Sequence, residues 1–147
     1  MFRKYRNNGL LGLTVFACGI ISGSMIQLAS VAGAQSGERV FELRTYTTHP
    51  GRLDALHARF TNHTIGLFER HGMTNIGYFV PQDDPLAENT LIYVLAHNSR
   101  EAAEASWAAF IADPDWQVAY QASISDGPIV DKIENVYMDA TDYSMIN

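Results

Sequence analysis

Residues 40–72 constrain the fold of this chain more than any other segment, because one run combines a strand pattern, a turn and a helix pattern. Apolar and polar side chains alternate from Val40 to Thr48, as they do in a half-buried strand. Pro50 is then expected in the first turn of a helix, since its missing N–H would have no partner there. Apolar residues recur at helical spacing until Gly72, a typical residue just past a helix C-terminus. Gly66 is expected to weaken or bend this helix locally.

The rest of the chain continues with strand and helix signals in turn. Strands are predicted at residues 74–80, 90–96 and 129–138 by their apolar, β-branched and aromatic content. The order β-α-β-β-α-β predicts an α+β fold of the ferredoxin-like, split βαβ plan, with one four-stranded antiparallel sheet and its helices on one face. The other face would carry many apolar residues, so we expect a homodimer whose two sheets close on each other as a dimeric α/β barrel.

Two capping patterns place the second and third helices. Asn98 is expected as an N-cap with Glu101 at the third helical position, in a capping box. Asp113 is expected as a second N-cap, with Pro114 at the first helical position.

The first 34 residues resemble an export signal. They contain a basic start, an apolar run and a small-residue cleavage motif: Arg3, Lys4 and Arg6, residues 10–31, and Ala32-Gly33-Ala34. We therefore expect residues 1–34 to be a signal peptide and the mature domain, residues 35–147, to be periplasmic or secreted. An uncleaved N-terminal membrane anchor stays open as an alternative, since the apolar run approaches the length of a membrane span.

Cysteine and charge limit the chemistry of the mature domain. Cys18 is the only cysteine, and it precedes the expected cleavage site. Lipid attachment at Cys18 is a further alternative. The mature domain then has no thiol for a disulfide, a nucleophile or a metal site. It would carry 7 basic and 16 acidic residues, a net charge of −9, and such an acidic surface argues against nucleic-acid binding.

Several motifs, in their order and spacing, resemble the NIPSNAP family of the dimeric α/β-barrel superfamily. They are Phe41-Glu42-Leu43-Arg44-Thr45-Tyr46, Pro50-Gly51, Leu67-Phe68-Glu69-Arg70-His71-Gly72, Gly77-Tyr78 and Asp113-Pro114-Asp115-Trp116. The resemblance covers residues 39–138 and leaves a short C-terminal tail. It implies a ferredoxin-like protomer and a tight dimer. Relatives in the superfamily include cofactor-independent monooxygenases, small-molecule isomerases and haem enzymes, and fold analogy alone does not choose among them.

His63 and His71 are the candidate catalytic residues. Eight positions apart on one helix, they share a broad face, and an imidazole lining a pocket between helix and sheet could act as a general base. The alternative is structural: His71 caps the helix and His63 makes an ordinary hydrogen bond.

Four residues are candidates for ligand binding. Arg44 and Tyr46 share one side of the first strand, and Tyr78 and Tyr93 could line the same cavity. Alternatively, Arg44 forms an ion pair with Glu42 at an interface. We expect no metal, because the histidines at 49, 57, 63, 71 and 97 include no pair three or four residues apart. No cofactor is expected, and the sequence contains no Gly-rich phosphate loop.

These observations predict an exported dimeric protein that binds a small apolar or aromatic molecule between the first helix and the sheet. Cofactor-independent monooxygenase or isomerase chemistry would be an extension of that function. The alternative is a non-catalytic interaction module whose tail, Tyr137 to Asn147, engages another protein. The sequence leaves open whether the protein is an enzyme. After removal of the leader, no membrane association is expected.

Overall fold

A computed structural model describes residues 39–146, and the expected signal peptide with Cys18 lies outside them. The elements are β1 (Val40–Thr48), α1 (Leu53–Arg59), η1 (Phe60–Thr64), α2 (Ile65–Arg70), β2 (Thr74–Phe79), η2 (Leu86–Glu88), β3 (Thr90–His97), α3 (Arg100–Ala112), α4 (Pro114–Ser123) and β4 (Val130–Asp139). Among the described residues, no helix is both long enough and apolar enough to cross a membrane.

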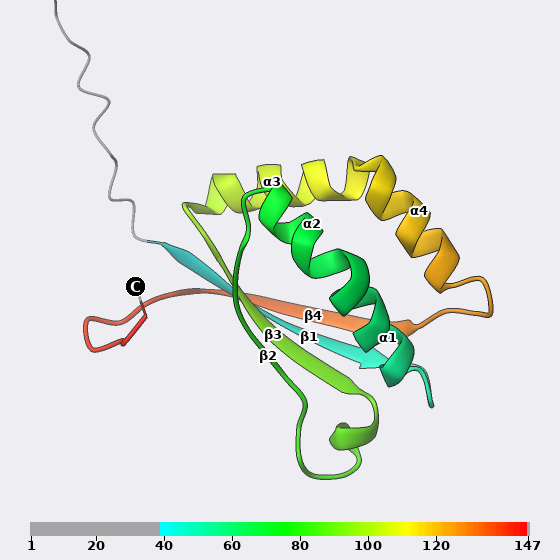
Figure 1. Cartoon of the computed structure of the whole chain (residues 1–147). Coiled ribbons are helices and arrows are strands. Elements are labelled where there is room, and N and C mark those ends of the chain that lie inside the picture. The colour runs from blue at the N-terminus through cyan, green and yellow to red at the C-terminus, as the bar shows by residue number, and fades with distance from the viewer. Residues whose placement is uncertain (1–38, 147) are drawn as a thin grey trace, which may run out of the picture. The chain divides into compact units, whose positions relative to one another are not determined.

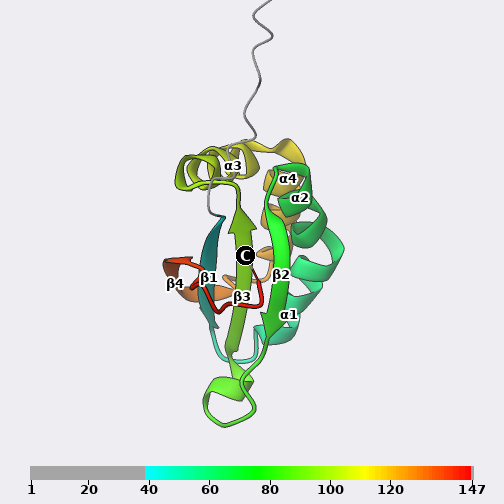
Figure 2. The ribbon, with the colours of Figure 1, turned by 90° about the vertical axis from the view of Figure 1, so that its left-hand side faces the viewer.

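The four strands form one antiparallel sheet in the order β2-β3-β1-β4, and the helices cover one face of it (Figure 1). Figure 2 shows the strands side by side in this order. Strand order and chain order together match the split βαβ plan. The predicted α+β, ferredoxin-like fold is therefore confirmed.

The register of β1 determines which of its side chains face the helices. Glu42, Arg44 and Tyr46 lie opposite Leu95, Tyr93 and Leu91 of β3, and those three leucine and tyrosine residues belong to the core beneath the helices. Because side chains alternate along a strand, the intervening residues of β1 point to the open face. The polar side of β1 is thus turned inward.

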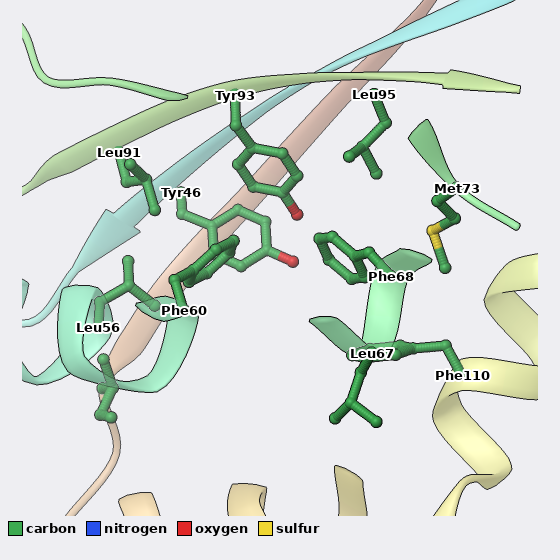
Figure 3. Packing of buried hydrophobic residues seen from close by; sticks show 11 residues of the cluster. Tyr46, Leu56, Phe60, Leu67, Phe68, Met73, Leu91, Tyr93, Leu95 and Phe110 are labelled. Atoms are coloured by element: carbon green, nitrogen blue, oxygen red, sulfur yellow. The ribbon is translucent and has the colours of Figure 1, made fainter. Parts of the chain in front are cut away.

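The core lies between this sheet face and the helices, and aromatic rings dominate it (Figure 3). Phe60 packs edge-on against Tyr46, Tyr93 and Phe68 at centroid distances of 5.2–6.1 Å. Rings in this arrangement gain more than their buried area alone provides. Trp107 and Trp116 pack against the same cluster.

One continuous helix runs from Leu53 to Arg70, but its middle turn, Phe60–Thr64, is π-helical. Thr64 supports this wider turn because its Oγ1 donates to the carbonyl of Arg59 at 3.2 Å. The irregularity ends just before Gly66, where the sequence predicted a weak point. A π turn changes the direction of the side chains around it and often marks a functional site.

The C-terminus of this helix forms a Schellman motif. Gly72 has φ 77°, its N–H donates to the carbonyl of Glu69, and the N–H of Met73 donates to that of Phe68. The left-handed conformation is the reason a glycine stands here.

The starts of two helices differ from the sequence-based expectations. The first helix begins at Leu53, and Pro50 lies in the preceding turn, where Gly51 takes a positive φ. Ser99 is the N-cap of α3, accepting from the N–H of Ala102 at 3.1 Å, so the predicted capping box was one residue out of place. Both helix starts are displaced by only a few residues, because neighbouring residues there have similar capping or turn propensity.

Strand β2 ends at Phe79 and contains a bulge between Asn75 and Gly77. The bulge interrupts the regular alternation of side chains that a strand over residues 74–80 would have. Tyr78 pairs with Tyr93 and faces the helices.

Candidate functional site

The clearest cavity of the described domain is an aromatic-lined space of about 340 Å³. It lies between the η1–α2 part of the first helix, α4 and the helix-facing side of β1 and β4. Its wall combines six aromatic residues, five aliphatic residues and three polar residues. They are Tyr46, Phe60, Phe68, Phe110, Trp116 and Tyr120; Ile124, Pro128, Ile129, Val130 and Ile133; and Arg59, Thr64 and Asp131.

The cavity extends from the core to the surface. Phe68 and Ile129 at its inner end are about 1% exposed, whereas Tyr120 and Ile133 at its outer end are 39% and 49% exposed. The space is therefore a cleft that opens at the surface and not an enclosed void. Its volume is at the lower end of the range of small-molecule sites.

Arg59 is the one cationic residue of the wall, and it is 5% exposed. Its guanidinium lies 5.6 Å from the ring centroid of Trp116 and 5.5 Å from that of Tyr120. Its Nη1 donates to Ser123 Oγ at 3.4 Å, a long hydrogen bond. Nε is buried and has no partner, and no carboxylate forms an ion pair with Arg59, among the residues that the structure describes. Burial lowers the pKa of Arg59, yet an arginine stays protonated at physiological pH.

The local fold explains this position. Arg59 immediately precedes the π turn, Phe60 begins it and Thr64 ends it, and all three are buried and line the cavity. The turn therefore directs one charged and one hydroxyl side chain inward from a helix that elsewhere presents apolar residues to the sheet.

Apart from the cavity, a cluster of polar side chains surrounds Glu42, which is fully buried. Its Oε1 accepts from Arg44 at 2.8 Å and its Oε2 from Trp107 Nε1 at 2.7 Å, while His97 Nε2 lies 3.1 Å from Oε2. Asn135 Nδ2 donates to Oε1 at 3.3 Å. Burial alone would raise the pKa of Glu42, but its hydrogen bonds with His97, Trp107 and Arg44, together with the Arg44 charge, hold it below its ordinary value.

Arg44 thus forms the ion pair that the sequence offered as an alternative to ligand binding. Its guanidinium also lies 4.1 Å from the ring centroid of Trp107. The pair faces the helices and not the open face of the sheet.

His71 has a structural partner at the end of α2. Its Nε2 lies 2.7 Å from Asp113 Oδ2, and the same carboxylate caps α4 by accepting from the N–H of Asp115. The hydrogen bond with His71, with the capping N–H, lowers the pKa of Asp113 despite its burial. His71 lines none of the pockets described in residues 39–146.

His63 is exposed and lines an outer groove between the first helix and α4. Arg59 borders both this groove and the inner cavity, so it separates His63 from the cavity. The catalytic roles of His63 and His71 stay predictions.

The four predicted ligand-binding residues are divided among different environments. Tyr46 lines the cavity, whereas Tyr78 lines a separate surface pocket beside β2. Tyr93 is fully buried within the core, and in Figure 3 its hydroxyl points the same way as that of Tyr46, toward Phe68. Burial raises the pKa of Tyr78 and of Tyr93.

The sequence-based search missed Arg59, Trp116 and Tyr120 as site residues. One signal was present, because Arg59 stands three residues after Leu56 and so falls on the apolar stripe of its helix. Trp116 and Tyr120 reach the cavity only because α4 packs beside that helix, and no local sequence pattern specifies this packing.

Within residues 39–146, no group of three histidine, aspartate or glutamate side chains is arranged to hold a metal ion.

The strand order and the one-sided helices define the class of this protein as a ferredoxin-like α+β domain. The sequence model of the NIPSNAP family matches residues 41–145, and the chain belongs to that family. A search of curated protein sequences gives no match.

Solved structures of the family have the same fold. A NIPSNAP family protein of unknown function from Agrobacterium tumefaciens is 23% identical, with a TM-score of 0.65 over 76% of this chain and 96% of that one. An uncharacterised NIPSNAP-like domain protein from Burkholderia xenovorans is 21% identical, with a TM-score of 0.64 over 74% of this chain and 90% of that one. At this level of identity the likeness extends to the fold alone.

Proposed function

We propose that the protein binds a small aromatic or apolar molecule in the cavity between the first helix, α4 and the sheet. The observation that carries this proposal is the cavity itself, whose wall is mainly aromatic and aliphatic and whose outer end reaches the surface beside Ile133. Pockets that are largely apolar, with a few convergent polar groups, are the usual form of small-molecule sites. Tyr46 and Thr64 supply hydroxyl groups and Arg59 supplies a charge.

Catalysis would be an extension of this binding. A cofactor-independent oxidation or isomerisation needs a base near the ligand, and His63 and His71 are the sequence-based candidates. His71 is held by Asp113, and His63 lies beyond Arg59, so either would need a side-chain rearrangement to reach a ligand in the cavity. Turnover by wild type, and its loss in His63→Ala or His71→Ala with the ligand affinity kept, would support the enzymatic form.

Blocking the cavity tests the binding proposal. Ile133→Trp places a large ring at the outer end, and Val118→Trp is the control, since Val118 is 71% exposed on α4 and does not line the cavity. Native mass spectrometry of protein from cells expressing the full chain, and calorimetry with small aromatic compounds, would measure occupancy. We expect wild type and V118W to bind and I133W to lose binding. Equal binding by I133W would contradict the proposal.

A second candidate function rests on the C-terminal tail. Tyr143 and Met145 are 86% and 98% exposed, and apolar side chains this exposed are a common feature of interaction segments. In this alternative the tail engages another protein without catalysis. Pull-downs with the full chain and with a chain lacking residues 141–147 would test it. Equal recovery of partners by both would count against the tail.

We also propose that two copies pair through their open sheet faces, and that the protein is exported after cleavage of the leader. The first proposal rests on the exposed apolar residues of that face, such as Phe79 and Val136. The second rests on the sequence of residues 1–34.

A further inference from the structure

Arg59 is a buried cation without a buried anion. It is 5% exposed, its Nε has no partner, and the structure gives it no ion pair among residues 39–146. Four other described arginines each have a carboxylate within 3.3 Å: Arg44, Arg52, Arg70 and Arg100. Arg59 is more deeply buried than Arg70 and Arg100 but has no such partner.

The contacts of Arg59 do not compensate its charge. The rings of Trp116 and Tyr120 offer cation–π attraction, and Ser123 accepts one long hydrogen bond. Such contacts contribute about 0.5–2 kcal/mol, whereas removing a charged group from water costs several kcal/mol unless an opposite charge and good hydrogen bonds offset it. A guanidinium has five N–H donors, and most of those of Arg59 stay free to bind an anion.

The surroundings indicate what kind of anion fits. Aromatic and aliphatic side chains form the rest of the wall around Arg59, so an inorganic ion would leave this apolar surface without contacts. A cyclic or aromatic body would fill the cavity, and a planar carboxylate matches the fork of a guanidinium.

We infer that the cavity selects small aromatic or cyclic carboxylic acids, with the ligand carboxylate paired to Arg59. This inference rests on the proposed small-molecule binding and adds the charge of the ligand. Asp131 is the one acidic residue of the cavity wall and is exposed, whereas Arg59 is buried, so the ligand carboxylate is expected at Arg59 and not beside Asp131. Stacking of Arg59 on Trp116 and Tyr120 holds its guanidinium in place before the ligand arrives, which reduces the entropy lost on binding.

The experiment compares cinnamate with its neutral analogue cinnamamide by isothermal titration calorimetry, on protein expressed from the full chain. We expect wild type to bind cinnamate at least about tenfold more tightly than cinnamamide, since a charge-assisted pair is lost in the amide. Arg59→Met should remove that preference while keeping cinnamamide binding, and Arg59→Lys should keep part of it. Arg100→Met, at an exposed arginine remote from the cavity, is the control and should behave as wild type.

The outcomes separate the two proposals. If wild type binds the acid and the amide equally, carboxylate recognition is wrong and small-molecule binding stands. If wild type binds neither, and I133W and wild type also behave alike with other small aromatic compounds, both proposals fail. The comparison of the two ligands on wild type needs no variant, so a folding defect in Arg59→Met would not obscure the result.

Discussion

At the scale of single residues, Glu42 and Arg59 are both buried and charged, but only Glu42 has an oppositely charged partner. Glu42 receives hydrogen bonds from Arg44, Trp107 and Asn135 and contacts His97. Arg59 has aromatic neighbours and one serine. A compensated buried charge stabilises its surroundings as long as all partners remain, whereas an uncompensated one costs stability until a ligand supplies the missing charge.

Glu42→Gln tests the compensated charge. The substitution keeps the shape but leaves the Arg44 guanidinium without its carboxylate, so we expect the free energy of unfolding to fall by about 3 kcal/mol. Glu134→Gln is the matched control, because Glu134 pairs with Lys132 at the surface with a side chain 58% exposed, and such pairs contribute less than about 1 kcal/mol. Chemical denaturation measures both. A loss in E42Q no larger than that in E134Q would contradict the role given to Glu42.

The pH dependence of the same variant gives a second prediction. The pKa of Glu42 is lower in the folded protein than its ordinary 4.5, so the unfolded chain takes up this proton first as the pH falls. The stabilisation is therefore complete above about pH 4.5 and is lost as the pH decreases through the folded-state value. We expect the difference in free energy of unfolding between wild type and E42Q to shrink when denaturation is repeated at about pH 3.5. A difference that stays constant would show that the carboxylate charge is not its source.

Arg59→Met should raise stability in the absence of ligand. Methionine fills a similar volume without a charge, so the desolvation cost disappears while cation–π contacts are lost, and we expect a gain of about 1 kcal/mol in the free energy of unfolding. Sites built for function often carry such a stability cost. Denaturant titration of ligand-free protein measures it, and a marked loss of stability would indicate that Arg59 is a structural residue.

At the scale of elements, the first helix has an irregular, π-helical middle and a regular Schellman motif at its C-terminus. The π turn at Phe60–Thr64 is followed by Gly66 in the middle of the exposed helix surface, and the helix ends at Gly72 in the left-handed conformation. The two glycines have different physical roles, because Gly66 is helical and Gly72 has φ 77°.

Alanine at each glycine distinguishes these roles. Gly66→Ala meets no atom within 4 Å and should stabilise the helix by about 0.5–1 kcal/mol. Gly72→Ala meets Ser106 Oγ only at an ordinary 3.8 Å, but the positive φ should cost about 1–2 kcal/mol. Thermal unfolding followed by circular dichroism would show the two midpoints moving in opposite directions. Movement in the same direction would contradict this reading of the helix.

Sequence periodicity predicted the elements well and the site only in part. The bounds of β1 were predicted correctly, because nine alternating residues leave little ambiguity. The bulge in β2 was missed, since an inserted residue changes the register without a change in composition. Arg59 was missed because its environment depends on Trp116 and Tyr120, more than fifty positions later in the chain. Local sequence patterns do not show which residues so far apart in the chain come into contact.

At the scale of the whole molecule, one face of the sheet is covered by helices and the other is open in the described protomer (Figure 1). On the open face, Phe79 and Val136 are 58% and 55% exposed. Lys132 and Glu134 lie further along β4 on the same face. Small domains seldom leave such an apolar strand surface in water, which is the physical basis for the proposed homodimer.

Sedimentation analysis tests this pairing. We expect wild type to sediment with twice the protomer mass and Val136→Glu to be shifted toward the monomer, because a charge would be buried between the sheets. Val118→Glu makes the same change at an exposed position of α4 and should stay dimeric. A dimer that survives V136E would place the interface elsewhere.

A crystal structure of the protein soaked with cinnamate would show whether a small acid occupies the cavity and pairs with Arg59. We expect electron density for the aromatic ring among Phe60, Trp116 and Tyr120, with a carboxylate oxygen about 2.8 Å from a guanidinium nitrogen of Arg59. An empty cavity at saturating cinnamate, or a ligand held in the outer groove beside His63 with Arg59 still unpaired, would show that the cavity does not bind acids in this way.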